Sequence, residues 1–367
     1  MPAANVIVHD KAQEKVNGKR KEKKHGNTYL NWLASETSTT WWHDSADPKE
    51  LQIGLERGAT GVTTNPVLAN TALRANRELW ADDINKVLAR NLPAAQKAEA
   101  LLRIAVVKTA EKLVPMFKSS RGELGYVCAQ VSPLLAGDRD GMLAMAKRLN
   151  AWSPNICVKL PASSAGIDTI EQCAAEGIST NATVSFTLAQ LLAVGEQAHR
   201  GAILAREHGI TPAKSFATMM IGRLDDYLRE VALDNQAAVS EADIVQAGLA
   251  VVKRAYAIYK ERGYETNLLV AALRGTNHLT DLAGGDIVLS VHPSIQEKVL
   301  ATELPREAGI DRAIDNGVIQ RLSLVREFVR AYEPTGLVPD EFIGYGVTQR
   351  TISQFIEAGW KGLESYK

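Results

Sequence analysis

Residues 155–162 read NICVKLPA, and this short stretch decides how the rest of the chain is interpreted. It is mostly aliphatic, Pro154 precedes it and a Ser-Ser-Ala-Gly turn follows, which is the pattern of a buried strand. Lys159 stands in its middle. Burial disfavours the charged ammonium, so a lysine here is costly unless it is paired or used. Lys159 is therefore either a strand-end lysine whose amine reaches water or a buried nucleophile.

The composition is that of an ordinary globular protein. The 367 residues are 46% hydrophobic and 23% charged, enough for one large α/β barrel or two smaller domains. The formal net charge is +0, so no basic bias predicts binding to nucleic acid. No stretch predicts a membrane span, and the N-terminus lacks the apolar core of a secretory signal. We therefore expect neither a nucleic-acid partner nor a membrane.

Cysteine usage and short motifs bear on compartment and cofactors. Cys128, Cys157 and Cys173 lack metal-like spacing, and their odd number in a long chain predicts reduced thiols and a cytoplasmic protein. The sequence shows neither a metal-ligand cluster nor a glycine-rich nucleotide loop. We therefore expect no metal and no cofactor.

Three segments follow one another along the chain. Residues 1–38 form a charged arm, residues 39–302 a catalytic domain, and residues 303–367 a helical segment packed on the outside of that domain. The arm is most simply a solvated tail; a contact with a partner subunit or nucleic acid is the alternative, although no aromatic residues interleave with its charges. The oligomeric state is left open, with a homo-oligomer as one option.

Strand candidates alternate with helical stretches across residues 39–302. There are eight of them: 39–44, 61–65, 125–133, 155–162, 179–186, 214–220, 267–274 and 286–292. This alternation predicts a single (β/α)8 TIM barrel. An open doubly wound sheet is the alternative, but it usually carries a glycine-rich phosphate loop after its first strand, which is missing here.

The alternation of side chains along each strand predicts which residues face the barrel interior. Lys159 lies on the face opposite to the uniformly aliphatic positions of its strand. The same parity turns Gln130, Asn181 and Thr183 inward, and Asp44 ends the first strand. Barrel enzymes hold their active sites at the carboxyl ends of the strands. Polar groups from several strands therefore converge where an active site is expected.

Four motifs in this order resemble the transaldolase family of class I aldolases. They are DSAD at 44–47, GVTTNP at 61–66, VKLPA at 158–162 followed by Gly166-Ile167, and EGI at 176–178 leading into NAT at 181–183. Two later pieces fit as well, IGRLD at 221–225 and AALR at 271–274. The resemblance runs from about residue 39 to residue 300 and implies the same barrel fold.

The resemblance also implies an activity, the transfer of a dihydroxyacetone unit between sugar phosphates through a lysine Schiff base, as in the pentose phosphate pathway. Lys159 is similar to the Schiff-base lysine, and Asp44 to the carboxylate that exchanges a proton with the C4 hydroxyl. Thr183 and Gln130 match positions around the catalytic water. The substrate-binding positions are Thr63, Asn65, Asn181 and Thr218 for the donor, and Arg223 and Arg274 for the phosphate.

Several of these residues also have plain structural interpretations. Asp44 can cap the following helix, and Asn65 can form a turn before a proline. Arg223 can pair at the surface with one of the carboxylates that follow it. Arg274, directly after an aliphatic strand, is harder to explain in this way.

The sequence departs from the family pattern at positions whose side chains take part in proton transfer in the family. Gln130 stands where transaldolases have a glutamate, and an amide can orient water but is no base at neutral pH. Fructose-6-phosphate aldolases have glutamine there, but they also have a tyrosine where this chain has Met220. Thr218 and Met219 replace a Ser-Pro pair, and Ala272 replaces a serine beside the phosphate.

These departures leave two alternatives to a transaldolase. The first is an aldolase that releases free dihydroxyacetone, which Gln130 favours and Met220 does not. The second is a non-catalytic protein that binds sugar phosphates. An unpaired buried lysine argues against it, because such a protein has no physical need for one.

Overall fold

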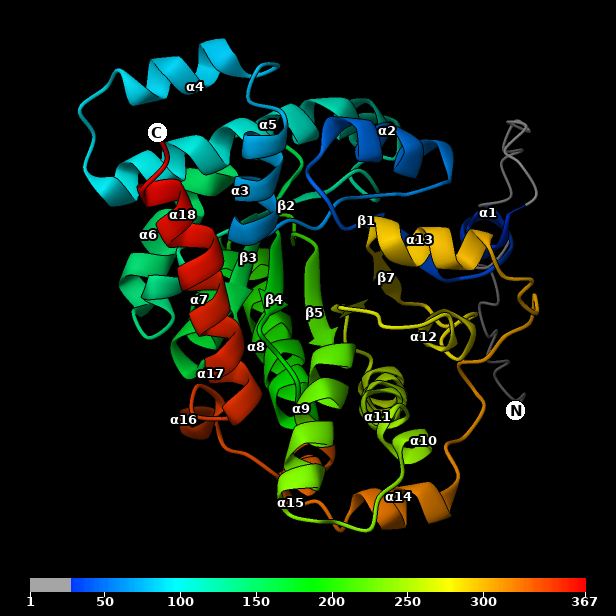
Figure 1. The fold of residues 1–367 in the computed structure, drawn as a ribbon. Coiled ribbons are helices and arrows are strands. Elements are labelled where there is room, and N and C mark those ends of the chain that lie inside the picture. Colours follow the sequence, from blue (N-terminus) through cyan, green and yellow to red (C-terminus); the bar gives the residue numbers. More distant parts are fainter. Residues whose placement is uncertain (1–27) are drawn as a thin grey trace, which may run out of the picture.

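The computed structural model describes residues 28–367 and contains one curled sheet of parallel strands (Figure 1). The predicted arm at 1–38 therefore lies mostly outside the described residues. Strand order in the sheet is β1-β7-β6-β5-β4-β3-β2. The strands are β1 (Thr40–His43), β2 (Val127–Gln130), β3 (Ile156–Pro161), β4 (Thr180–Thr183), β5 (Ser215–Met220), β6 (Asn267–Ala271) and β7 (Val288–Val291). The predicted α/β class with a parallel sheet is confirmed.

The segment predicted as the second of eight strands contributes a single residue to the sheet. Val62 forms parallel bridges to both β1 and β2, the two edge strands. A β-carbon added at Gly61 would lie 2.6 Å from the Trp42 ring, and Asn65 already caps the next helix. The extended backbone between these two constraints is short. The structure therefore has seven strands and a one-residue bridge where the sequence predicted eight strands.

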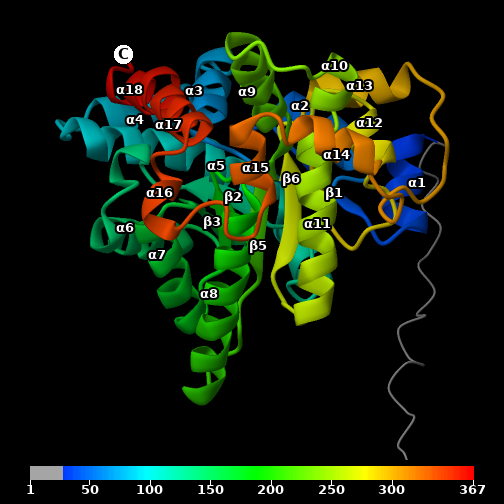
Figure 2. The same cartoon turned by 90° about the horizontal axis from the view of Figure 1, so that it is seen from below.

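Helices surround the sheet in both views (Figures 1 and 2). Those before β5 are α1 (Tyr29–Glu36), α2 (Pro48–Glu56), α3 (Pro66–Ala75), α4 (Ala81–Leu88), α5 (Ala94–Ser119), α6 (Arg139–Asn150), α7 (Ser164–Ala175) and α8 (Leu188–Glu207). Those after β5 are α9 (Ile221–Asp234), α10 (Glu241–Ile244), α11 (Ala247–Arg262), α12 (Asn277–Thr280) and α13 (Pro293–Leu300). In the described range 28–367, no helix has the length and apolar character to cross a membrane.

Aromatic side chains and thiols fill the interior of the curled sheet beneath the carboxyl ends of the strands. The Trp42 and Phe216 rings meet edge to face with their centroids 4.7 Å apart. Cys128 and Cys157 are buried in the same cluster. Side chains two residues further along a strand face the same way. Lys159, two residues after Cys157, therefore lies on the same face and nearer the carboxyl ends of the strands.

Short helices follow α13, drawn in orange to red in Figure 1, and the last of them lies beside α3. They are α14 (Asn316–Leu322), α15 (Arg326–Tyr332), α16 (Pro339–Phe342), α17 (Gly346–Gln354) and α18 (Lys361–Glu364), with a π-helical segment, Phe355–Trp360, between the last two. A β-carbon at Gly359 would lie only 2.7 Å from the Val67 nitrogen. This close approach holds the C-terminal helix against the segment that carries Asn65.

Candidate active site

A cavity of about 260 Å³ opens at the carboxyl ends of the strands. Five of the predicted site residues line it: Asp44, Asn65, Lys159, Arg223 and Arg274. The other five, Thr63, Gln130, Asn181, Thr183 and Thr218, are buried and are not part of its lining. The predicted set therefore divides into residues that line the cavity and buried residues that do not.

Lys159 projects into this cavity from β3. Its side chain is 4% exposed, and its Nζ donates to the Thr64 carbonyl oxygen at 3.2 Å. It forms no salt bridge with any residue in the described range 28–367. The strand-end interpretation, in which the amine reaches bulk water, does not describe this geometry. The lysine is instead a buried amine held by a neutral oxygen at the edge of the cavity.

Asp44 follows β1 and is fixed by a chain of hydroxyl groups. Thr63 Oγ1 donates to Asp44 Oδ1 at 2.6 Å, and it lies 2.7 Å from Ser290 Oγ. One hydroxyl carries one proton, so Ser290 is the donor in the second bond. Asp44 Oδ2 has no hydrogen-bond partner in the part of the chain that the structure describes. Thr63 thus orients the carboxylate and leaves one oxygen for a ligand.

Gln130, Lys159 and Asn181 form one row across three neighbouring strands. Gln130 pairs in register with Lys159, and Lys159 with Asn181. The Gln130 side chain is 2% exposed, and its Oε1 has no hydrogen-bond partner among residues 28–367. Buried acceptors of this kind are rare in folded proteins. Gln130 Oε1 is therefore a buried acceptor in the row of the lysine that lacks a partner within the described residues.

Asn181 is held by hydrogen bonds to side chains of two other strands. Thr218 Oγ1 donates to Asn181 Oδ1 at 2.5 Å, and Asn181 Nδ2 lies 3.3 Å from Cys128 Sγ. Thr183 Oγ1 lies 3.9 Å from the Met220 sulfur, a weak acceptor. The Thr183 hydroxyl is thus less constrained than the hydroxyl of Thr218.

Asn65 has two tasks at the start of α3. Its Oδ1 accepts the Leu68 backbone N–H at 3.0 Å, which caps the helix, and Pro66 occupies the first helical turn. The side chain also lines the cavity. With the oxygen committed to the cap, the amide nitrogen is the group that remains to donate to a ligand. The turn interpretation and the binding interpretation are therefore both compatible with this geometry.

Two arginines line one wall of the cavity. Arg223 Nη1 donates to Gln354 Oε1 at 2.6 Å, and Arg274 donates twice to Asp226 Oδ2, at 2.9 and 2.8 Å. Burial, and next the positive charge of Arg274, lower the pKa of Arg223. The two guanidinium groups therefore repel each other, and an anion between them would relieve that repulsion.

The lining residues outside the predicted set include four with polar or aromatic side chains: Ser290, His292, Gln354 and Phe355. The first two end the strand predicted at 286–292, so the parity rule could have found them. The last two come from the C-terminal helical segment, and nothing in the sequence places that segment over the cavity. Arg223 also lies with its guanidinium carbon 5.8 Å from the centre of the Phe355 ring.

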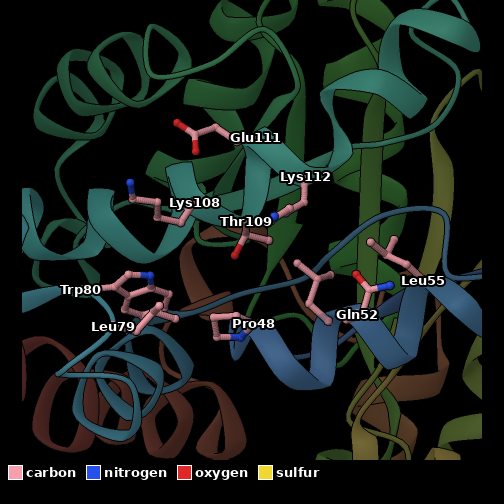
Figure 3. Close-up of a pocket in the computed structure, with 10 residues that line it drawn as sticks. Pro48, Gln52, Leu55, Leu79, Trp80, Lys108, Thr109, Glu111 and Lys112 are labelled. Atoms are coloured by element: carbon pink, nitrogen blue, oxygen red, sulfur yellow. The ribbon is translucent and has the colours of Figure 1, made fainter.

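A second cavity, of about 350 Å³, lies in the outer helix layer between α2 and α5 (Figure 3). Leu51, Leu55, Leu79 and Trp80 supply much of its apolar wall, with Lys108 and Lys112 beside them. None of the predicted site residues lines it. Within residues 28–367 no group of three or more His, Cys, Asp or Glu side chains is arranged to hold a metal ion.

Comparison with known proteins agrees with the motifs. Identity to the transaldolase of Thiobacillus denitrificans is 33% over 234 residues, 60% of the chain and 62% of that protein. The match thus spans about three fifths of that relative's length. Transaldolases of Acidothermus cellulolyticus and Arthrobacter sp. are 26% identical over 308 residues and 25% identical over 358 residues. These two matches cover 78% and 90% of the chain and 81% and 92% of the respective proteins.

Residues 41–330 match the family described as Transaldolase/Fructose-6-phosphate aldolase. This range contains every predicted site residue and most of the chain. The predicted resemblance is confirmed, and the chain belongs to the Transaldolase/Fructose-6-phosphate aldolase family.

Proposed function

We propose that the protein transfers a dihydroxyacetone unit between sugar phosphates through a Schiff base on Lys159. One observation carries this proposal: a 4% exposed amine without a salt bridge in the described range 28–367 lines a cavity together with a carboxylate and two arginines. Such an amine can attack a ketone, the arginines suit a phosphate, and the carboxylate suits proton transfer. The named relatives, all transaldolases, add support.

In the proposed reaction, Lys159 Nζ attacks C2 of a ketose phosphate, water leaves, and an iminium ion forms. Asp44 Oδ2 then takes the proton of the C4 hydroxyl group, the C3–C4 bond breaks, and its electron pair moves toward the iminium nitrogen. The first aldose phosphate leaves, and the bound enamine adds to a second aldehyde by the reverse steps. Hydrolysis of the iminium frees the lysine. Gln130 and Thr183 are proposed to position the water, and Asn65 and Asn181 to bind donor hydroxyl groups.

We also infer that the curled sheet and its helices form an eight-unit (β/α)8 barrel. Val62 occupies the place of a shortened second strand between β1 and β2, which supports this inference. A cytoplasmic location is proposed with it. The three cysteines are unpaired and buried, and Cys128 stands opposite Cys157 in register without a disulfide, as a reducing compartment would maintain them.

Dependence on an acceptor tests the proposed transfer. The protein is incubated with fructose 6-phosphate, with and without an aldose phosphate acceptor, and free dihydroxyacetone and new ketose phosphate are measured. We expect ketose formation that requires the acceptor, together with a borohydride-reduced adduct on Lys159 by mass spectrometry. Release of dihydroxyacetone at the same rate without acceptor would instead establish the aldolase. If neither fructose 6-phosphate nor dihydroxyacetone gives an adduct, both the transfer reaction and the aldolase reaction are excluded.

The aldolase remains the second candidate because of Gln130. An unpartnered amide oxygen beside the lysine can orient water but cannot deprotonate it. We expect Gln130→Glu to raise transfer on ordinary sugar phosphates by about tenfold, since a carboxylate adds general-base assistance. The measurement is kcat/KM for the acceptor-dependent reaction. Gln246→Glu, at a half-buried amide before α11 that does not line the cavity, is the matched control. An unchanged or lower rate in Gln130→Glu would show that Gln130 does not limit transfer.

A further inference from the structure

The cavity lacks the acids that related sites carry at Gln130 and Met220, and His292 stands where a donor is needed. The Asp44 backbone N–H donates to the Val291 carbonyl at 3.2 Å, and the β1–β7 register ends one residue earlier. Asp44 and His292 therefore continue the register of β1 and β7 by one residue and lie opposite each other. Both line the cavity. Side chains at such paired positions lie on the same face of the sheet.

Hydrogen bonds fix which nitrogen of His292 carries its proton. The Ser294 backbone N–H donates to His292 Nδ1 at 3.2 Å, and Ser294 Oγ lies 2.9 Å from the same nitrogen. A backbone N–H can only donate, so Nδ1 is the acceptor and a neutral ring holds its proton on Nε2. Nε2 has no hydrogen-bond partner among residues 28–367. The ring therefore offers an N–H donor on the edge turned away from α13.

The simplest role for His292 is to cap α13, but capping alone does not call for an imidazole. Asn, Asp, Ser and Thr are the preferred residues at this position. The other nearby histidine, His43, is unsuited to the chemistry. Its Nδ1 faces Gln296 in the helix layer, and burial lowers its pKa to about 4. Of these two histidines, His292 is the one whose ring borders the cavity.

We propose that His292 is a catalytic hydrogen-bond donor to the oxygen on C4 of the substrate; this rests on the Schiff-base function proposed above. In the addition step, the enamine carbon attacks the aldehyde and the new carbon–carbon bond forms. The carbonyl π electrons move to the oxygen, where Nε2–H stabilises the developing charge. Asp44, protonated in the preceding cleavage, then gives its proton to that oxygen. His292 keeps its own proton throughout, so the step is balanced without another reactant.

Two substitutions separate the donor from the helix cap. Asn at position 292 can still accept the Ser294 N–H, but its side chain is too short to place a donor where Nε2 lies. Gln is longer and carries an amide N–H close to that position. We expect His292→Asn to lower kcat by about 10²-fold and His292→Gln by no more than about tenfold. Trapping of the donor on Lys159 by borohydride should be unchanged in both variants, because the Schiff base forms before C4 reacts.

The matched control is His208→Asn, at an exposed histidine that ends α8 and does not line the cavity. We expect it to match the unaltered protein. A kcat within about threefold of the unaltered protein in His292→Asn would overturn the proposal, because removal of such a donor costs far more. Loss of the trapped adduct in parallel with turnover would also overturn it, since His292 would then act in donor binding. If the unaltered protein itself forms no adduct, the proposed function fails instead.

Discussion

Lys159→Met abolishes turnover and leaves the fold intact; this is the largest effect that we expect. Methionine is apolar and of similar length, so it fits a position that is only 4% exposed. The substitution removes one hydrogen bond, from Nζ to the Thr64 carbonyl, and the nucleophile itself. Loss of a covalent nucleophile should lower kcat by at least about 10⁴-fold. The measurements are the acceptor-dependent rate and the mass of the protein after donor and borohydride.

Lys214→Met provides the comparison, since Lys214 is a partly exposed lysine paired with Glu123 at the surface. It should keep both the rate and the reduced adduct. The assignment of Lys159 would be contradicted if Lys159→Met retained a rate within about tenfold of the unaltered protein. An equal yield of adduct on another lysine would contradict it as well.

Asp44→Asn should give the second largest loss, and it should separate bond cleavage from Schiff-base formation. Asparagine keeps an oxygen that accepts the Thr63 hydroxyl, so the side chain should stay in place. Its amide cannot take the proton from the C4 hydroxyl. We expect kcat to fall by about 10²- to 10⁴-fold, the range for loss of a general acid–base group. The donor adduct on Lys159 should accumulate, because its formation does not need that proton.

Asp286→Asn, at an exposed carboxylate just before β7, is the control for the change of charge. Full activity in this variant would show that the loss belongs to position 44. If Asp44→Asn were active, Oδ2 would not be the proton acceptor. If it formed no adduct, Asp44 would be needed earlier, for carbinolamine formation.

The alternation of side chains along each strand was enough to predict which polar residues face the interior of the sheet. Gln130, Lys159 and Asn181 were each predicted to face inward, and their strands confirm it by forming one row. Parity gives the face of a residue but not the register between strands. The sequence therefore could not tell that Gln130 and Asn181 flank the lysine in register, or that neither of them lines the cavity.

The strand ends were predicted less well, for a physical reason. The strand predicted at 61–65 has β-branched residues, but Gly61 must fit against Trp42 and Asn65 must cap α3. Such tertiary constraints override local preference. At the end of β7 the predicted strand ran through His292, whereas the observed strand stops at Val291 because position 292 caps α13.

The wall formed by Gln354 and Phe355 was beyond reach from the sequence. The local sequence of a helix does not show which distant residues the helix will contact. Gln354 bonds Arg223, and 131 positions separate the two residues. The contact of Gly359 with the Val67 backbone shows why a glycine stands there, but only once both segments are seen together.

The separation along the sequence between Lys159 and that wall has a consequence for synthesis. The ribosome makes Lys159 first and Gln354 195 residues later. At roughly 5–20 residues per second, the nascent chain carries its reactive amine for about 10 s or more before the last wall exists. A stalled or truncated chain would thus carry the nucleophile without Gln354 to hold Arg223. The wall that holds Arg223 therefore forms well after Lys159 has been made.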